Sequence, residues 1–221
     1  MAQIFSPAAD TWLRAAVAVA VVLVAGLTLF ASGYARSDYQ TRQGWFVDQP
    51  VPFSHQHHVG DLGIDCRFCH ADAERGPHAG FPATHTCMTC HSQVWTGAPV
   101  LAPIRDSLST GKPITWNRVS GLPDYVYFNH SIHVGRGVPC ETCHGRIDKM
   151  PMTNRANAFT MRFCLDCHRD PAPRLRPPDQ VTRMDWSGWA DTPAHKQFAL
   201  TAARKYHLAA AHLTDCSLCH R

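Results

Sequence analysis

The spacing of the cysteines constrains this chain more than any other feature of its sequence. All ten cysteines fall in five C-x-x-C pairs, and a histidine follows each pair directly. The cysteines are Cys66, Cys69, Cys87, Cys90, Cys140, Cys143, Cys164, Cys167, Cys216 and Cys219. The histidines that follow them are His70, His91, His144, His168 and His220. With fifteen histidines in 221 residues, five such neighbours by chance have odds on the order of one in a million.

C-x-x-C-H is the attachment motif of c-type haem. Two thiols three positions apart reach the two vinyl groups on one porphyrin edge, and the adjacent histidine presents an imidazole nitrogen to the iron. Zinc ribbons combine two C-x-x-C units per site, which leaves one of five unmatched and the histidines unused. A disulfide framework also leaves the histidines unexplained. The sequence therefore predicts five covalently bound haem c groups, with the five histidines as proximal iron ligands.

The formal net charge of +4 changes once these cofactors are counted. Each haem brings two propionates, so five haems bring about −10 and the loaded chain carries about −6. The basic sequence pI is therefore no footprint of nucleic-acid binding, and the chain has no Lys/Arg-rich run that would suit a phosphate backbone. We expect no nucleic-acid partner.

An uncharged apolar run of 20 residues, 15–34, lies between Arg14 and Arg36. About 20 such residues cross a bilayer as a helix. The alternative, a cleavable signal peptide, has an apolar core of about 7–15 residues and a small-residue cleavage site, which residues 33–35 fit poorly. We expect a retained single-pass anchor in the cytoplasmic (inner) membrane. Haem attachment takes place outside that membrane, so we expect the N-terminus inside and the haem domain in the periplasm.

The remainder of the chain contains a duplication. Residues 53–60 (FSHQHHVG) align with residues 128–135 (FNHSIHVG), and each copy is followed by two C-x-x-C-H motifs. Corresponding positions in the two copies lie 74 to 77 residues apart, which is typical of a repeated unit. The fifth motif, at Cys216, stands outside the repeat.

The repeat also predicts the sixth ligands of four irons. Its shared pattern is F-x-H-x-x-H-V, and His57 falls out of this register. Two histidines three positions apart lie on one side of a helical turn and can approach two neighbouring haems. The histidines in register, which we expect to bind iron on the distal face, are His55, His58, His130 and His133.

The fifth iron needs its sixth ligand from elsewhere. We expect methionine, because a thioether raises the potential of a c-type haem, although methionine also fills gaps beside flat apolar surfaces. The candidates of choice are Met150 and Met161. The other candidates are Met152, His85, His195, His207 and His212.

Several stretches together resemble the pentahaem cytochrome c subunit of alternative complex III, a bacterial quinol:acceptor oxidoreductase. They are PFSHQHHVGDLGIDCRFCH from Pro52, ATHTCMTCH from Ala83, YFNHSIHVGRGVPCETCHG from Tyr127 and TMRFCLDCHRDPAPRLRP from Thr160. The pattern F-x-H-x-x-H also resembles cytochromes c3 and c7 within each repeat.

The resemblance implies a relay subunit that is no enzyme on its own, and we assign no catalytic residue. In that family a quinol is oxidised at polytopic membrane subunits, and electrons pass through an iron–sulfur protein to the pentahaem subunit. They leave through a monohaem cytochrome, a periplasmic cytochrome c or a terminal oxidase. The alternative is a small membrane-anchored multihaem quinol dehydrogenase that feeds a periplasmic reductase. Multihaem nitrite reductases are larger and hold one haem by lysine, so they fit less well.

We expect a mainly α fold with much irregular coil. A transmembrane helix precedes a multihaem cytochrome c domain with a haem-packed core, short helices and duplicated c3/c7-like units. The expected divisions are a cytoplasmic tail and anchor (1–36), a first dihaem repeat (37–96), a Pro-rich connector (97–123), a second dihaem repeat (124–170), and a segment with a linker, a helix and the fifth haem site (171–221). A helix over 192–213, capped by Thr192, should lead directly into the last motif.

Overall fold

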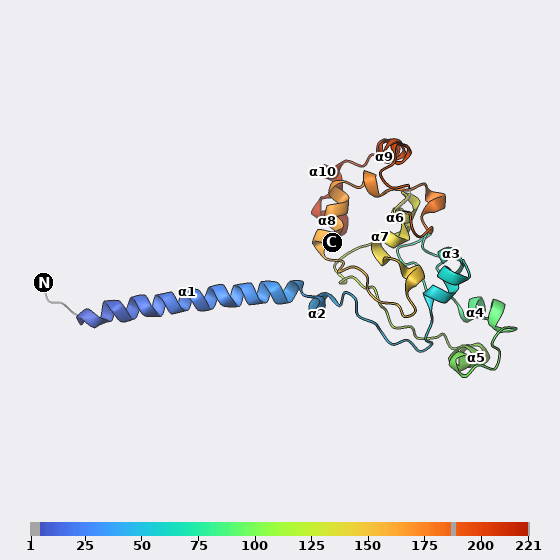
Figure 1. Cartoon of the computed structure of the whole chain (residues 1–221), viewed down its shortest axis with the longest axis horizontal. Coiled ribbons are helices and arrows are strands. Elements are labelled where there is room, and N and C mark those ends of the chain that lie inside the picture. Colours follow the sequence, from blue (N-terminus) through green and yellow to red (C-terminus); the bar gives the residue numbers. More distant parts are fainter. Residues whose placement is uncertain (1–4, 187–188, 221) are drawn as a thin grey trace. The chain divides into compact units, whose positions relative to one another are not determined.

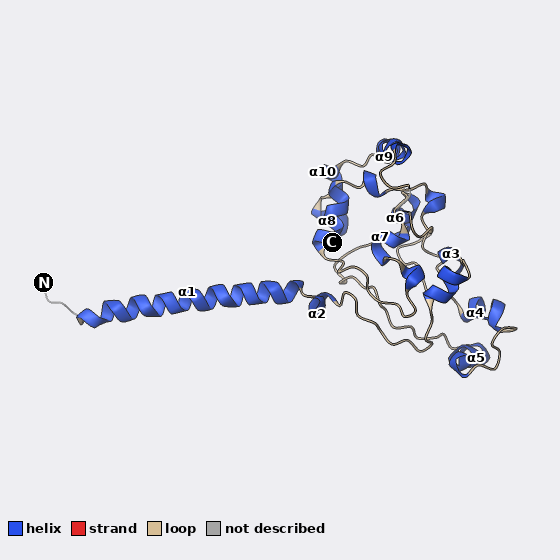
Figure 2. Cartoon of the chain, in the orientation of Figure 1, coloured by secondary structure: helices blue, strands red, loops and turns tan. Residues whose placement is uncertain are grey.

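Helices provide all the regular structure in the computed structural model, which describes residues 5–186 and 189–220. Within these ranges the only β contacts are two isolated bridges, Phe46–Asn154 and Val126–His220. The expected mainly helical fold with much coil is therefore confirmed (Figures 1 and 2). The chain divides into two compact units, one ending at Arg42 and the other beginning at Gln43.

The first unit is dominated by α1 (Pro7–Arg36), which is followed by the single turn α2 (Asp38–Thr41). Pro7 stands in the first turn of α1, where its missing N–H costs nothing. The helix has 30 residues, a mean hydropathy of 2.5 in its most apolar window, and no buried residue in its own unit. At 1.5 Å per residue it is about 45 Å long, enough to cross a bilayer. Among the described residues it is the one helix with this length and composition.

The second unit is built from short helices joined by long loops (Figure 2). Its α-helices are α3 (Cys66–Cys69), α4 (Thr84–His91), α5 (Ala102–Thr110), α6 (His130–Gly135), α7 (Cys140–His144), α8 (Met161–Arg169), α9 (Pro193–Lys205), α10 (Ala210–Leu213) and α11 (Cys216–Cys219). One π-helical turn, η1 (Gln56–Asp61), and the 3₁₀ turns η2 (Pro99–Leu101), η3 (Ile147–Lys149), η4 (Ala172–Arg174) and η5 (Pro178–Gln180) complete the set.

Few apolar side chains of this unit are buried against one another. The buried hydrophobic residues are Val51, Leu101, Ile104, Val134, Leu175, Val181, Ala199 and Ala202. Aromatic side chains such as Phe68, Phe81 and Tyr127 are exposed instead. A domain of this length normally buries a much larger apolar core. The small core fits a chain whose remaining apolar surface is covered by bound cofactors.

The C-terminal helix prediction is right at its start and wrong at its end. The Thr192 hydroxyl accepts a hydrogen bond from the backbone N–H of His195, and Pro193 opens α9 as predicted. The helix ends at Lys205, however, and does not continue into the last motif. His207 takes the left-handed conformation (φ 52°), and the N–H of Leu208 donates to the carbonyl of Ala203. This is the Schellman ending of a helix, here with histidine in place of the usual glycine.

Candidate haem-binding sites

Each C-x-x-C-H motif lies on one turn of helix, which places its two thiols on the same side. Three of the motifs begin their own helices, α3, α7 and α11. Asp65 and Asp215 fix two of these starts, since each carboxylate accepts the backbone N–H two residues on at 2.9 Å. The Arg67 guanidinium, which also donates to Asp65, holds the pKa of that carboxyl at about 2. The sequence therefore specifies the local geometry of the motifs.

Three of the histidines predicted as distal ligands lie opposite a motif histidine. The ring centroids are 6.2 Å apart for His58 and His91, and 6.4 Å apart for His130 and His144. The third pair, His133 and His168, is separated by 6.1 Å. Two imidazoles that bind one iron from opposite faces, with iron–nitrogen bonds of about 2 Å, have centroids about 6 Å apart. The spacing of all three pairs therefore fits one iron between the rings.

The fourth histidine in register, His55, is buried and lies near the motif histidine His70. Burial lowers the pKa of His55 to about 4, and the neighbouring imidazole of His70 lowers it further than any other charge. Burial likewise lowers the pKa of His144 to about 4. The rings of His55 and His144 are therefore neutral at pH 7, which is the form that binds a metal.

The outer nitrogens of these rings explain how the histidines are aimed. In seven of them Nδ1 lies 2.8–3.2 Å from a backbone carbonyl oxygen. The pairs are His58 with Ser54, His70 with Gly80, His91 with Val94, His130 with Pro77, His133 with Asn129, His168 with Leu213 and His220 with Tyr125. A carbonyl only accepts, so Nδ1 carries the proton and Nε2 keeps its lone pair. A hydrogen bond from the outer ring nitrogen to a fixed carbonyl orients a histidine for metal binding.

The two copies of the repeat have matching ring geometry. In the first copy the Phe53 ring is 4.9 Å from His55, edge-on, and stacks on His58 at 4.3 Å. In the second copy the Phe128 ring is 4.7 Å from His130, edge-on, and stacks on His133 at 4.5 Å. The phenylalanine of F-x-H-x-x-H thus holds both histidines of its copy in fixed orientations. His57 is oriented differently and stacks on Trp95 at 6.3 Å.

The fifth motif has no paired histidine of this kind among the described residues. His220 stacks on Tyr125, with centroids 5.9 Å apart. Met150 lies near Gly145, beside the third motif, and Met161 is largely exposed at the start of α8. His195 is buried with both ring nitrogens hydrogen-bonded, to the Leu175 carbonyl and to the N–H of Asp191. His195 therefore has no nitrogen free for iron, while methionine ligation of one haem stays a prediction.

The motifs contact one another in a series that sequence reasoning did not predict. Burial raises the pKa of the Cys69 thiol and the nearby Cys87 raises it further, which places the second motif beside the first. The thiols of Cys66 and Cys140 are within hydrogen-bonding reach, which joins the first and third.

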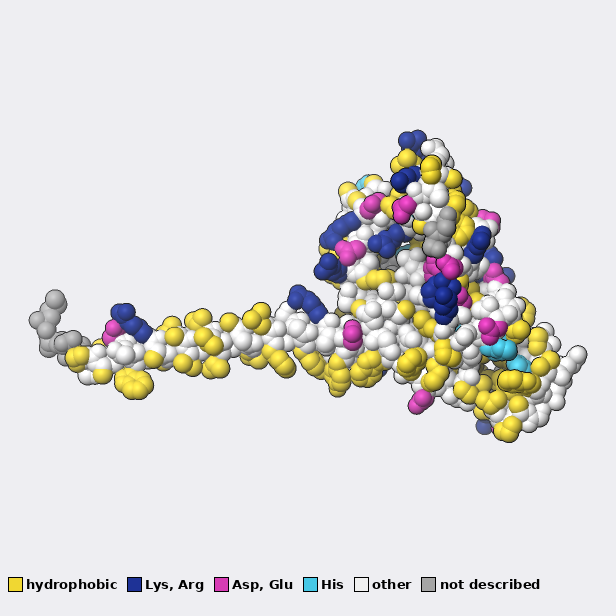
Figure 3. Space-filling view, viewed as in Figure 1, with side chains coloured by type: hydrophobic (Ala, Val, Ile, Leu, Met, Phe, Trp, Pro, Cys, Tyr) yellow, Lys and Arg dark blue, Asp and Glu magenta, His cyan; other side chains and the backbone are white. Residues whose placement is uncertain are grey.

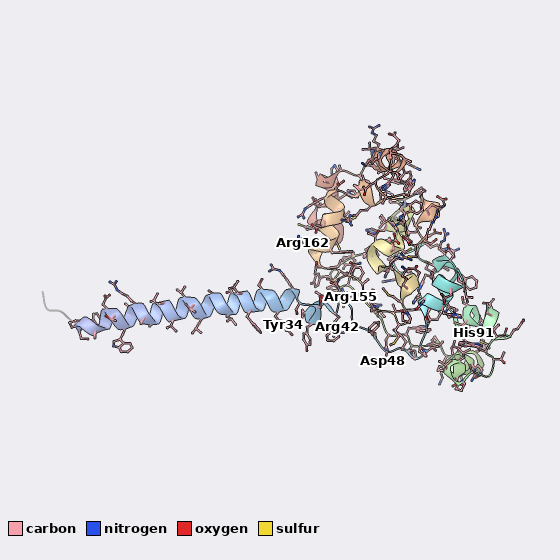
Figure 4. The ribbon with its side chains drawn as sticks, in the orientation of Figure 1. Tyr34, Arg42, Asp48, His91, Arg155 and Arg162 are labelled. Carbon is pink, nitrogen blue, oxygen red and sulfur yellow. The ribbon has the colours of Figure 1, made fainter. Side chains whose placement is uncertain are left out.

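The series continues to the fourth and fifth motifs. Burial raises the pKa of Cys143 to about 12, helped by Cys167 and Cys164 of the fourth motif. The fifth motif follows, because the nearby Cys219 adds to burial in raising the pKa of Cys164. The spatial order is therefore second, first, third, fourth, fifth. Figure 1 shows α4, α3, α7 and α8 following one another in this order across the second unit, and Figure 4 marks His91 at the α4 end.

No protein-family profile matches the chain. The chain is similar to the multiheme cytochrome c subunit of menaquinone reductase from Nitratidesulfovibrio vulgaris, with 30% identity over 177 residues. These residues make up 79% of this chain and 77% of the relative. The facing histidine rings, their carbonyl-bound Nδ1 atoms and the small apolar core all fit haem c as the cofactor. On this identity and coverage, the chain belongs to the family of multihaem cytochrome c subunits of quinone-linked oxidoreductases.

Proposed function

We propose that this chain is the electron-transfer subunit of a membrane quinol-oxidising respiratory complex of the alternative complex III type. The single observation that carries the proposal is the end-to-end series of neighbouring motifs, from Cys87 to Cys219. Haem iron supplies one-electron exchange between its Fe(II) and Fe(III) states when bound at such motifs. A row of attachment sites suits transfer over a distance better than chemistry at one place.

The role of each residue follows from this proposal. The ten cysteines form thioether bonds to five haems, and the five motif histidines are the proximal ligands. The distal ligands pair as His55 with His70, His58 with His91, His130 with His144, and His133 with His168. Met150 or Met161 serves one remaining iron. At these four sites an imidazole would bind each face of the haem iron. The side chains there hold and orient the haem, and they leave no coordination position on the iron for a substrate.

The location and partners are part of the same proposal. The α1 helix anchors the chain once in the inner membrane with its N-terminus inside, and the haem domain lies in the periplasm. Its partners are an iron–sulfur protein, polytopic quinol-site subunits and a monohaem cytochrome. A periplasmic cytochrome c or a terminal oxidase accepts the electrons. The length and composition of α1 and the resemblance of the motif stretches support this arrangement.

A second candidate is the opposite direction of flow, toward a menaquinone. It is favoured by the relative, which is the subunit of an enzyme named for menaquinone reduction. The two directions require different potentials. Electrons flow from quinol to the chain if its irons have higher potentials than the quinone couple, and from the chain to quinone if they have lower ones.

Redox titration of the complex purified from membranes tests both candidates. We expect most irons to titrate above the potential of the native quinone and to be reduced when quinol is added. Titration entirely below that potential, with quinone oxidising the reduced chain, would establish the reductase direction. Intact mass of the denatured chain should exceed the polypeptide mass by about five haems, roughly 3.1 kDa. A smaller increment would show that at least one motif carries no haem.

A further inference from the structure

The chain around the second motif lacks ionisable Asp, Glu, Lys and Arg side chains. Residues 77–104 contain none of these four types, although they make up 17% of the whole sequence. At that share, 28 residues would contain about five. This stretch includes α4 and surrounds the site at one end of the motif series. Its histidines are the only titratable side chains apart from the motif cysteines.

Large apolar side chains of this stretch point into solvent. Val94, Trp95 and Val100 are all exposed, Trp95 by 63% and Val94 by 54%. Figure 3 shows hydrophobic and histidine side chains gathered at the α4–α5 end of the second unit, while charged groups are more frequent elsewhere on the visible face. We call Val94, Trp95, Val100 and His57 the α4 face. Asp61, 3.7 Å from the His57 ring, and Arg105, which donates to the Thr96 and Ala98 carbonyls, lie at its rim.

Trp95 is held in an unfavourable backbone conformation on this face. Its φ of 58° lies in the left-handed region, which bulky residues rarely adopt. Such strain persists only where the surroundings fix it, and it is most frequent at functional sites. Here the preceding carbonyl, of Val94, accepts the Nδ1 proton of His91, and the indole stacks on His57. The indole is 63% exposed and lies outside the buried apolar core of the chain.

The Trp95–His57 pair borders the terminal site directly. His57 precedes His58, whose ring faces His91 at 6.2 Å. His57 is also the one histidine of the first copy that falls out of the repeat register, and the second copy has Ile132 at its place. The pair therefore belongs to the terminal site and has no counterpart in the second copy.

We propose that the α4 face is the docking surface for a permanent protein partner that presents an uncharged, apolar surface and exchanges electrons at the Cys87 end of the chain. This inference rests on the proposed function. A partner with charges at the contact would have to bury them without counter-charges, which costs several kcal/mol per ion. Cores of stable interfaces are instead depleted of charge and enriched in aromatic residues, with tryptophan a frequent anchor. The face has this composition.

The test compares arginine substitutions at two equally exposed apolar residues. Val94 lies on the α4 face, and Leu200 lies on α9 with the same exposure of 54%. The Val94→Arg and Leu200→Arg complexes are purified from membranes in mild detergent. We measure the subunits retained per haem chain in low salt and in about 1 M salt, where charge interactions are screened beyond about 3 Å.

We expect wild type and Leu200→Arg to retain their partner subunits in both salts. For Val94→Arg we expect the amount of partner retained per haem chain to fall at least tenfold. Trp95→Ala, which removes the anchor and adds no charge, should also lower retention. The absorption spectrum of each isolated chain should match wild type, which shows that the sites are intact. Equal retention by Val94→Arg and Leu200→Arg would overturn the proposal. So would a wild-type complex that dissociates as salt rises, because that is the behaviour of a charged interface.

The outcome also separates this inference from the proposed function. If quinol reduces the wild-type chain but Val94→Arg keeps its partners, the relay stands and the docking face is wrong. If the wild-type complex keeps its partners but exchanges electrons with neither quinol nor quinone, the proposed function is wrong.

Discussion

The two copies of the repeat hold their histidines alike but stand in different surroundings. In the first copy His55 directly precedes the widened π-helical turn η1 and His58 lies on it, whereas both histidines of the second copy lie on the α-helix α6. The first copy ends in the uncharged α4 face. The second copy is covered by the segment 171–186, which buries an ion pair against it. The histidine ring geometry is therefore the same in both copies, while the surroundings of the two copies differ.

One pair of equivalent positions illustrates this divergence. Glu141, inside the third motif, forms a buried ion pair with Arg176. Arg176 also donates to the Arg183 carbonyl at 2.8 Å and lies over the Trp186 ring. The equivalent of Glu141 in the first copy is Arg67, which makes exposed ion pairs with Asp65 and Glu74. The same position is therefore negative in the second copy and positive in the first, and only in the second copy is its ion pair buried.

The largest effects should come from the proposed distal ligands. His58→Ala or His133→Ala should each turn one iron high-spin, because the remaining ligand binds from one face only. The adjacent changes His57→Ala and Ile132→Ala should leave the spin state unchanged. Absorption and electron paramagnetic resonance spectra of the oxidised protein measure this. A high-spin signal from His57→Ala, with none from His58→Ala, would mean that the register is displaced by one residue.

The buried ion pair should have the next largest effect. Arg176→Leu removes the cation from the largely buried Glu141, which keeps only the hydrogen bond from the Asp185 backbone N–H, and we expect a loss of about 3–5 kcal/mol in unfolding free energy. Arg67→Leu removes exposed pairs and should cost about 1 kcal/mol or less. Denaturant unfolding of both variants in detergent makes the comparison. Equal losses would contradict the idea that the Arg176–Glu141 pair of segment 171–186 stabilises the second copy more than the Arg67 pairs stabilise the first.

Two glycines provide a smaller contrast between the copies. Gly137 has φ 87°, and a Cβ there would overlap the Arg176 carbonyl oxygen. Gly63 has φ 67°, but a Cβ there would meet open space. Both alanine variants carry the backbone penalty of about 1 kcal/mol, and Gly137→Ala should lose about 1–3 kcal/mol more because the covering segment must shift. Thermal unfolding should therefore separate the variants, and an equally tolerated Gly137→Ala would argue against tight contact with that segment.

Sequence patterns predicted the local structure and missed the contacts between residues that are far apart in the chain. The C-x-x-C-H turns, the Thr192 cap and the membrane-length helix all follow from short spacings. The pairing of Arg176 with Glu141 joins residues 35 positions apart and leaves no periodic signal. The order of the motifs in space depends on loop paths, and so the neighbours Cys66 and Cys140 could not be identified from spacing. The helix break at His207 was missed because histidine replaces the glycine that usually marks it.

The smallest predicted difference concerns acid stability at the first motif. The Arg67 hydrogen bond, partly opposed by burial, lowers the pKa of Asp65 from 3.8 to about 2. A carboxyl whose pKa is depressed on folding stabilises the protein above its unfolded pKa, and this contribution is lost as pH falls from about 4 to about 2. Because the site is largely exposed, we expect less than about 1 kcal/mol. The second copy has Pro139 at this position and no such group. Asp65→Asn should therefore reduce stability at pH 6 and leave it nearly unchanged at pH 2, when unfolding is followed at both pH values. A loss at pH 2 as large as that at pH 6 would show that Asp65 acts through its cap geometry and not through its charge.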